Sequence, residues 1–193
     1  LVGTVIPGYV SRSKITYKDT DEIYLDPAVY HHQGTSEQIV NWDSQLTFQF
    51  GSGGTNEDSS DLAVSDWYYV YLDDSAIVTA GTNVITASEI VAVTTEPSWS
   101  AAKHGWYNGN DRCIFAVKTN GSSQVEQFYH DGDLVLYDTH YATVADELGT
   151  TWTDIVLNAP SFATRMPVRF YAGYVSAATY VDGYWRTNGQ SGT

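Results

Sequence analysis

Basic residues are scarce in this chain. Among its 193 residues, nine are Lys or Arg and 23 are Asp or Glu, which gives a formal net charge of −14 and a pI near 4.4. Nucleic-acid binding depends on Lys and Arg neutralising phosphates, and attraction to anionic membrane surfaces needs the same side chains. We therefore expect no nucleic-acid partner. The charge itself is typical of a well-solvated surface, or of carboxylates gathered around a hard cation.

Cysteine and long apolar runs are also lacking. Every apolar run is far shorter than the roughly 20 residues of a membrane-spanning helix, so we expect no membrane insertion. The one cysteine, Cys113, excludes a disulfide within the chain and is expected to be a small buried apolar residue. A catalytic thiolate would need a neighbouring base and a polar pocket.

Several catalytic signatures are missing. The sequence has no GxSxG elbow, no GxxxxGK[ST] phosphate loop, no HExxH helix and no CxxC pair. A glycosidase needs only two facing carboxylates, so it stays open as an alternative function. The candidate pairs are Asp73 with Asp74 and Asp131 with Asp133. Adjacent strand residues face opposite ways, and both pairs have the character of turns.

The residues that are abundant favour β-structure. Val, Thr and Tyr total 55, whereas Leu, Met, Lys and Glu total 21. Branched and aromatic side chains pack well on pleated sheets. We predict an all-β fold with little helix: an antiparallel, jelly-roll-like β-sandwich forming a single domain over residues 1–186, followed by a flexible tail at 187–193.

Local patterns place several strands. Lys14–Tyr17 and Glu22–Leu25 are predicted to form a hairpin, and Leu46, Phe48 and Phe50 alternate along a strand with one wet face. Asn120-Gly121 predicts a hairpin between Arg112–Thr119 and Ser122–His130.

The register of that hairpin is chosen by matching apolar residues. A two-residue loop would place Phe115 opposite Glu126. A three-residue loop with Gly121 left-handed would place Phe115 opposite Val125, and we prefer this register.

Trp67–Leu72 is apolar on both faces, and Asp73-Asp74-Ser75 then turns the chain into Ala76–Thr79. Such a strand is either central or covered by another chain. We predict an oligomer interface at Trp67, Tyr69 and Tyr71, and hence a homo-oligomer. The alternative is that a loop such as Thr79–Ile90 folds over this face within the chain.

Two groups of residues could bind a cation. Gly51–Asp61 is polar and acidic and is typical of a solvated loop, with a cation site as the alternative, since its Asn56, Glu57, Asp58 and Asp61 offer the oxygen ligands that Ca²⁺ prefers. His31 and His32 are adjacent, so they face opposite ways and fit a metal site poorly. We expect no cofactor other than, as the alternative, this Ca²⁺.

Aromatic residues give the positive signal. Tyr outnumbers Phe by 15 to six, a ratio that favours surfaces that are both apolar and wet. A turn-rich stretch combines aromatic rings for stacking on a sugar with polar groups for its hydroxyls: Trp106, Tyr107, Asn108, Asn110 and Asp111. We predict a ligand site there. The alternative is that Trp106 plugs one end of the sandwich.

Trp67–Ile77 and Lys103–Phe115 resemble segments of bacteriophage virion proteins of the tail-fibre, spike or head-decoration type, within a similarity spanning about Ile23 to Tyr137. The resemblance implies a non-enzymatic component of the virion surface, hence extracellular. It also implies assembly with copies of itself, as a trimer for a fibre tip, and with other virion proteins, in particle structure or in attachment to a cell-surface glycan. It carries no catalytic residues. The rivals are a carbohydrate-binding adhesive module of a secreted protein and a polysaccharide-cleaving glycosidase.

Overall fold

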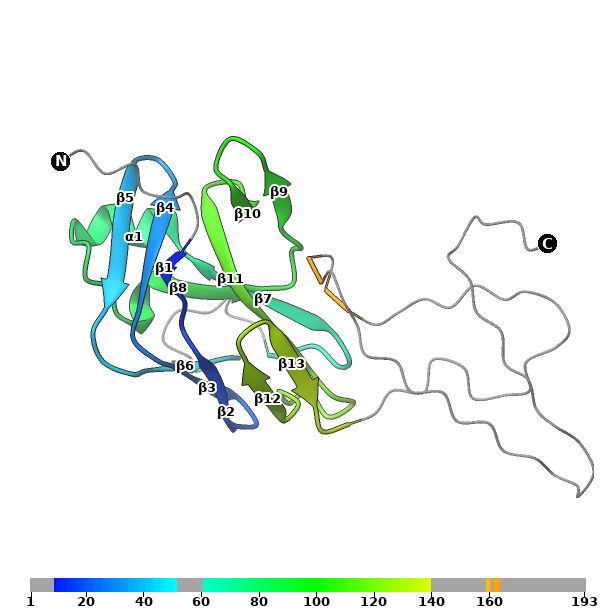
Figure 1. Ribbon diagram of the computed structural model, residues 1–193. Coiled ribbons are helices and arrows are strands. Elements are labelled where there is room, and N and C mark those ends of the chain that lie inside the picture. Colours follow the sequence, from blue (N-terminus) through cyan, green and yellow to red (C-terminus); the bar gives the residue numbers. More distant parts are fainter. Residues whose placement is uncertain (1–8, 52–60, 140–158, 161, 164–193) are drawn as a thin grey trace, which may run out of the picture. The chain divides into compact units, whose positions relative to one another are not determined.

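The computed structural model describes residues 9–51, 61–139, 159–160 and 162–163 (Figure 1). The predicted all-β class is confirmed, because these residues form antiparallel sheets with little helix. The strands are β1 (Tyr9–Ser11), β2 (Ile15–Asp19), β3 (Glu22–Leu25), β4 (Ala28–Gln33), β5 (Glu37–Trp42), β6 (Leu46–Gln49), β7 (Trp67–Leu72), β8 (Ile90–Val93), β9 (Ser98–Ser100), β10 (Gly105–Asn108), β11 (Asp111–Lys118), β12 (Phe128–Asp131) and β13 (Leu134–Tyr137).

Chain contacts divide the protein into two units, Leu1–His140 with Pro160–Phe162, and Tyr141–Ala159 with Ala163–Thr193. Everything below concerns the first. The predicted single domain over 1–186, the tail at 187–193 and the sandwich or jelly-roll topology stay predictions. In the described part of the chain, no helix is long and apolar enough to cross a membrane.

The largest sheet has five strands in the order β8-β7-β11-β10-β9. Three smaller sheets accompany it, in the orders β2-β3-β6, β1-β4-β5 and β12-β13. The predicted hairpin around residues 18–21 is confirmed, since β2 pairs with β3. The predicted alternation of β6 is confirmed as well, because Phe48 and Phe50 are buried and Thr47 is exposed.

One apolar core joins the inner face of the five-stranded sheet to its neighbours. Phe50, just after β6, meets Tyr68 of β7 edge to face, with ring centroids 6.5 Å apart. Phe115 of β11 lies 5.4 Å from Phe128 of β12. Side chains fully enclosed in this core include Trp42, Phe48, Ile23, Leu25 and Leu72.

A short helix, α1 (Asp74–Ala80), follows β7 where the sequence suggested only a turn and an extended segment. Asp73 caps its first turn by accepting a hydrogen bond from the Ala76 amide at 3.0 Å. Gly81 ends it with φ +64°. These caps explain a helix in a segment with β-branched residues, and the turn character of Asp73 is the capping role. A single 3₁₀ turn, η1 (Ala87–Glu89), precedes β8.

The predicted hairpin joining residues 112–119 to 122–130 is wrong. β11 pairs with β7 and β10, whereas β12 pairs with β13. Only a bridge between Thr119 and Val125 joins the two segments. The turn is longer than expected because the Asn120 side chain accepts hydrogen bonds from the amides of Ser122 and Gln124. Ser123, not Gly121, takes the left-handed conformation.

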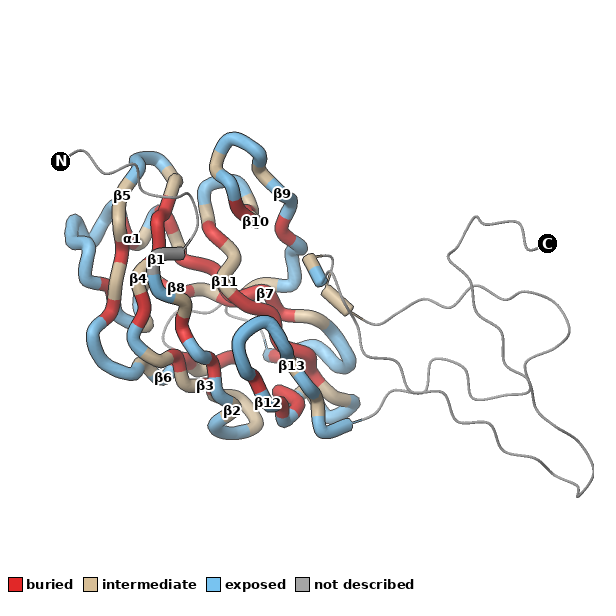
Figure 2. The backbone as a smooth tube through the Cα atoms, viewed as in Figure 1, coloured by how far each residue is buried: buried red, intermediate tan, exposed pale blue. Residues whose placement is uncertain are grey.

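β7 lies between β8 and β11 in its sheet and is apolar on both faces. A central position was one of the two explanations that the sequence left open for such a strand. Tyr69 and Tyr71 on its outer face are 4% and 1% exposed (Figure 2). The chain itself covers them, with Val91, Val93, Cys113 and Phe162 packed around them. The predicted interface assumed an apolar surface open to a second subunit, and Tyr69 and Tyr71 do not offer one. Trp67 is half-buried.

The loop named as the alternative cover for that face lies elsewhere. Ile85 and Asn83 exchange backbone hydrogen bonds with Asn41 of β5. Residues 79–90 therefore pack along the β1-β4-β5 sheet, not over Tyr69 and Tyr71. A homo-oligomer stays a prediction.

Gly34, between β4 and β5, tests the packing at this end of the core. A Cβ there would overlap the carboxylate of Asp74 and lie 2.6 Å from the His32 ring. We expect Gly34→Ala to lower the free energy of unfolding by at least about 2 kcal/mol in urea titrations, since overpacking displaces a buried polar network. Gly121→Ala is the control, with nothing within 4 Å of its Cβ and no positive φ. Equal stability of the two variants would contradict this packing.

His130 of β12 makes stability depend on pH. Burial, reinforced by the nearby cations Arg12 and Lys14, lowers its pKa below the ordinary value. Its ring accepts from the Ile15 amide at 3.0 Å, which suits the neutral form. The unfolded chain therefore binds the proton more tightly, and stability should fall as pH drops from about 7 to 5, by up to about 1.4 kcal/mol per pH unit.

The variant His130→Gln isolates this contribution. It should have a shallower decline of unfolding free energy over the same pH range, measured by denaturant titration. Identical slopes for the variant and the parent would show that His130 does not carry the effect.

Candidate functional site

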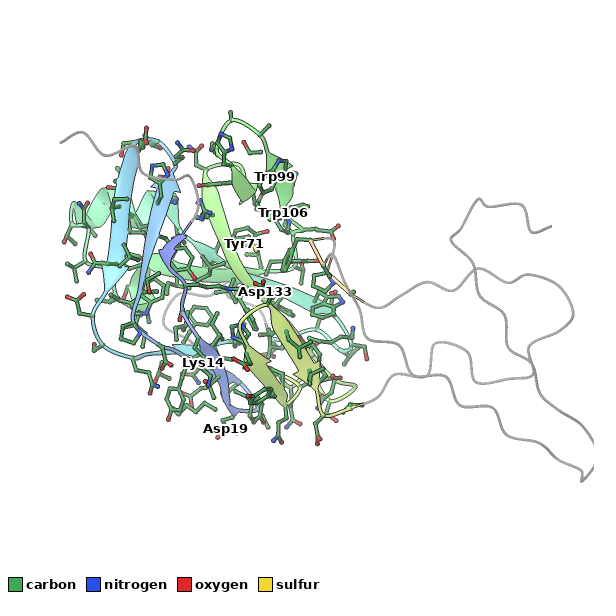
Figure 3. All side chains as sticks on the ribbon, in the orientation of Figure 1. Lys14, Asp19, Tyr71, Trp99, Trp106 and Asp133 are labelled. Atoms are coloured by element: carbon green, nitrogen blue, oxygen red, sulfur yellow. The ribbon has the colours of Figure 1, made fainter. Side chains whose placement is uncertain are left out.

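Two tryptophans lie side by side at the edge of the five-stranded sheet. β9 is the last strand of that sheet, and its Trp99 is directly opposite Trp106 of β10. The two ring centroids are 5.7 Å apart at 68°, an edge-to-face arrangement (Figure 3). Trp99 is 54% exposed and Trp106 is half-buried. Tryptophan side chains are mostly buried in folded proteins, so an aromatic surface that stays in contact with water suits ligand binding.

The tryptophans continue the outer face of the sheet. Phe162 lies 6.0 Å from Trp106 and 6.1 Å from Tyr69, so aromatic contacts run unbroken from β7 to β9. The Tyr71 hydroxyl donates to the Thr95 carbonyl at 2.7 Å. The Tyr69 hydroxyl donates to the Glu96 carboxylate at 3.2 Å. Burial raises the pKa of both tyrosines, so they act as neutral donors that fix the segment before β9.

Strand alternation divides the five residues predicted as a ligand site. Trp106 and Asn108 share the outer face of β10 and are half-buried, whereas Tyr107 points to the inner face and is 3% exposed. Tyr107 is therefore not available to a ligand. Asn110 is exposed in the turn between β10 and β11, next to Gly109 with φ +61°. Asp111, which pairs with Asn108, is half-buried.

Tyr107 instead anchors a buried polar cluster behind the site. Its hydroxyl accepts a hydrogen bond from the Arg112 guanidinium at 2.9 Å and one from the backbone amide of Gln33 at 3.1 Å. Arg112, 6% exposed, also donates to the His31 carbonyl at 2.8 Å. These bonds join β10 and β11 to β4, so Tyr107 and Arg112 hold the strand that carries Trp106.

A second buried group lies beside this cluster. The Asp74 carboxylate accepts from the Thr35 amide and hydroxyl, the latter at 2.6 Å, and lies 3.1 Å from Nε2 of His32. Burial would raise the pKa of Asp74, but these hydrogen bonds outweigh it and the pKa lies below its usual value. Burial lowers the pKa of His32 despite the nearby carboxylate. These shifts favour a neutral His32 beside an ionised Asp74, and the contacts of Asp74 tie β4 and the residue Thr35 after it to the start of α1.

The carboxylates considered for a glycosidase make contacts that hold the fold together. Asp73 caps α1, and Asp74 holds Thr35. The Asp74 amide also donates to Asp111 at 2.9 Å, and burial raises the pKa of that carboxyl. Asp131 and Asp133 flank Gly132, which turns between β12 and β13 with φ +59°, and Asp133 pairs with Arg12. Helix capping and a buried hydrogen bond account for the first pair, and a hairpin turn accounts for the second.

The predicted cation site is mostly outside the described residues. Asn56, Glu57 and Asp58 are not among the residues that the structure describes. Asp61 is described, and it is exposed. Within residues 9–51 and 61–139, no group of three or more His, Cys, Asp and Glu could hold a metal ion. The two adjacent histidines are separated as expected: His31 pairs with Glu37 at 2.7 Å and His32 with Asp74.

Sequence reasoning missed Trp99. Ser98-Trp99-Ser100 has one apolar residue between two polar ones, a pattern too short to identify a strand by alternation. Its significance depends on the register with β10, which brings Trp99 opposite Trp106. A second tryptophan seven residues before Trp106, across a turn-rich segment, was the available signal.

Comparisons of the chain with protein-family models, with curated proteins and with solved structures gave no match. A proposal about its function therefore rests on the contacts described above.

Cys113 tests the packing of the outer face. It is half-buried opposite Tyr71, its thiol donates to the Phe115 carbonyl at 3.4 Å, and burial raises its pKa to about 12. Because only the thiolate reacts, we expect labelling by a disulfide reagent at pH 8 to be at least about 100-fold slower in the native protein than in guanidinium. As this is the only cysteine, the signal is unambiguous. Equal rates would mean that the outer face is open.

Proposed function

We propose that this protein is a non-enzymatic binding module that attaches to carbohydrate through Trp99 and Trp106. The observation that supports this is the edge-to-face pair of an exposed Trp99 and a half-buried Trp106 at the open edge of the sheet. An indole stacks on the apolar face of a sugar ring and loses little side-chain entropy in doing so. Asn108 on the same face and Asn110 in the adjoining turn offer amides to the sugar hydroxyls.

We further propose that the module belongs to the surface of a bacteriophage particle, as a fibre, spike or capsid-decoration subunit. The support is the resemblance carried by Trp67–Ile77 and Lys103–Phe115. These segments include β7, β10 and most of β11, which form the centre of the sheet and the strand bearing Trp106. Attachment of the particle to a host glycan would use the tryptophan pair. Assembly with copies of itself and with other virion proteins belongs to the same proposal.

Among the residues that the structure describes, no observation favours the alternative of a polysaccharide-cleaving glycosidase. Its carboxylate pairs cap a helix, hold Thr35 or occupy a hairpin turn. A carbohydrate-binding module of a secreted protein would use the same tryptophan surface, so it differs from our proposal in its biological setting and not in its chemistry.

Trp99→Ala and Trp106→Ala test the proposal. The parent protein is first applied to an array of glycans that includes bacterial surface polysaccharides, and Kd is then measured by calorimetry for the strongest glycan. We expect each variant to weaken binding at least tenfold, because loss of one stacked tryptophan typically costs about 2 kcal/mol.

Tyr129→Ala is the matched control. Tyr129 is an aromatic residue with similar exposure, 57%, but it lies on β12 outside the tryptophan surface. It should bind within about twofold of the parent. No glycan binding by the parent, or equal losses in all three variants with unchanged circular dichroism, would refute the proposed function.

A further inference from the structure

Asn120 lies in the turn after β11, and this turn fixes its side chain between two backbone amides. The Oδ1 oxygen of Asn120 accepts hydrogen bonds from the amide of Ser122 at 2.8 Å and from the amide of Gln124 at 3.1 Å. The backbone of Asn120 is held as well. Its amide donates to the Gln124 carbonyl at 2.8 Å, and its carbonyl accepts from the Ser123 amide at 3.2 Å. The side-chain amide of Asn120 is therefore oriented relative to the backbone around it.

The hydrogen bond from Ser122 brings two atoms of the chain together. An Asn side chain that accepts from the amide two residues further on forms an Asx turn, which folds the side chain back over the peptide bond that follows. That peptide bond joins Asn120 to Gly121, so the Gly121 nitrogen is held close to Cγ, the amide carbon of the Asn120 side chain. Holding two reacting atoms in this way, at about 3–3.5 Å, strongly accelerates a reaction between them.

The Gly121 nitrogen is also accessible. Gly121 is exposed, and a Cβ added to it would meet nothing within 4 Å. Among the residues that the structure describes, none accepts a hydrogen bond from the Gly121 amide. Because glycine has no side chain to obstruct the approach, this nitrogen can lose its proton to water and attack Cγ.

The two amides that hold Oδ1 would stabilise the intermediate of that attack. As the Gly121 nitrogen bonds to Cγ, the Oδ1 oxygen becomes negatively charged. The amides of Ser122 and Gln124 already donate to this oxygen, which is the arrangement of an oxyanion hole. Donors that are in place before the charge develops lower the barrier without any rearrangement of the turn.

We infer that Asn120 is a site of self-modification, in which the Gly121 nitrogen attacks the side-chain amide. The bond between the Gly121 nitrogen and Cγ forms a succinimide. The bond between Cγ and Nδ2 breaks, and Nδ2 leaves as ammonia with the proton of the Gly121 amide. Water then opens the ring, giving aspartate by cleavage at Cγ or isoaspartate by cleavage at the backbone carbonyl.

The modification changes the turn in two ways. Either product adds one negative charge to a chain whose net charge is −14. Isoaspartate also inserts a methylene group into the backbone, next to the Asn120 carbonyl that accepts from the Ser65 amide at 3.0 Å. The contact between the end of β11 and the segment before β7 would therefore be lost as the protein ages.

The chain contains a matched control, because Asn108-Gly109 is the same dipeptide. Asn108 lies at the end of β10, where it is half-buried and pairs with Asp111. Within the described part of the chain, its side chain has no hydrogen-bond donor. Asn108 therefore lacks both the Asx turn and the oxyanion donors of Asn120.

The test follows both asparagines in the full chain at pH 8, in the native state and in guanidinium, by mass spectrometry of tryptic peptides. Arg112 and Lys118 place them on different peptides. We expect Asn120 to react at least as fast in the native protein as in guanidinium, whereas Asn108 should react at least about tenfold more slowly in the native protein. Slower reaction of native Asn120 would mean that its hydrogen bonds protect the amide. Equal native rates at the two sites would mean that the dipeptide alone decides. Either result would overturn the inference.

Gly121→Ala identifies the attacking atom. The variant should keep the turn, since its Cβ has free space and Gly121 has no positive φ, but the methyl group crowds the nitrogen. We expect the native rate at Asn120 to fall at least about tenfold and the rate at Asn108 to stay unchanged. The parent product should contain isoaspartate, detected with an isoaspartyl methyltransferase. An unchanged rate in the variant, or aspartate as the only product of the parent, would show direct attack by water and contradict the inference.

Discussion

The burial of β7 on both faces is the constraint on which the rest of the structure depends. Tyr68, Val70 and Leu72 face the common core, and Tyr69 and Tyr71 face outward yet are buried as well. A strand of this kind must be central and must have a cover on each side. The inner cover is the set of smaller sheets. The outer cover includes Phe162, which packs on Tyr69, and Val91, Val93 and Cys113 flank the two tyrosines from neighbouring strands of the same sheet. The tyrosine hydroxyls fix the segment that leads to β9.

The outer cover becomes thinner toward the edge of the sheet. Trp106 still touches Phe162, but Trp99 beyond it is more than half exposed. On the inner face of the same strands, Tyr107 and Arg112 hydrogen-bond to β4. An edge strand that was merely frayed would not hold two indoles at a defined angle. The buried cluster ties β10 and β11 to β4, and this rigidity would reduce the entropy lost in the binding that we propose.

The sequence predicted features that depend on composition and short-range periodicity. The all-β class, the hairpin of β2 and β3 and the wet face of β6 all follow from alternation. It failed where side-chain contacts or long-range register decide. Asn120 lengthens its turn through its own side chain, and both edges of β11 are occupied by β7 and β10, so β12 pairs with β13 instead. Tyr107 was grouped with Trp106 because they are adjacent, but adjacency places them on opposite faces. Trp99 gained its role only through pairing with β10.

Native-state hydrogen exchange tests most directly whether β7 is the constraint on which the structure depends. Amides of Tyr69, Val70 and Tyr71, which lie between β8 and β11, should exchange only through global unfolding and share one free energy. Amides of β9, paired on one side only, should exchange through local opening at least about 100-fold faster. Exchange of the β7 amides as fast as those of β9 would contradict the account, because the sheet would then open without loss of the core.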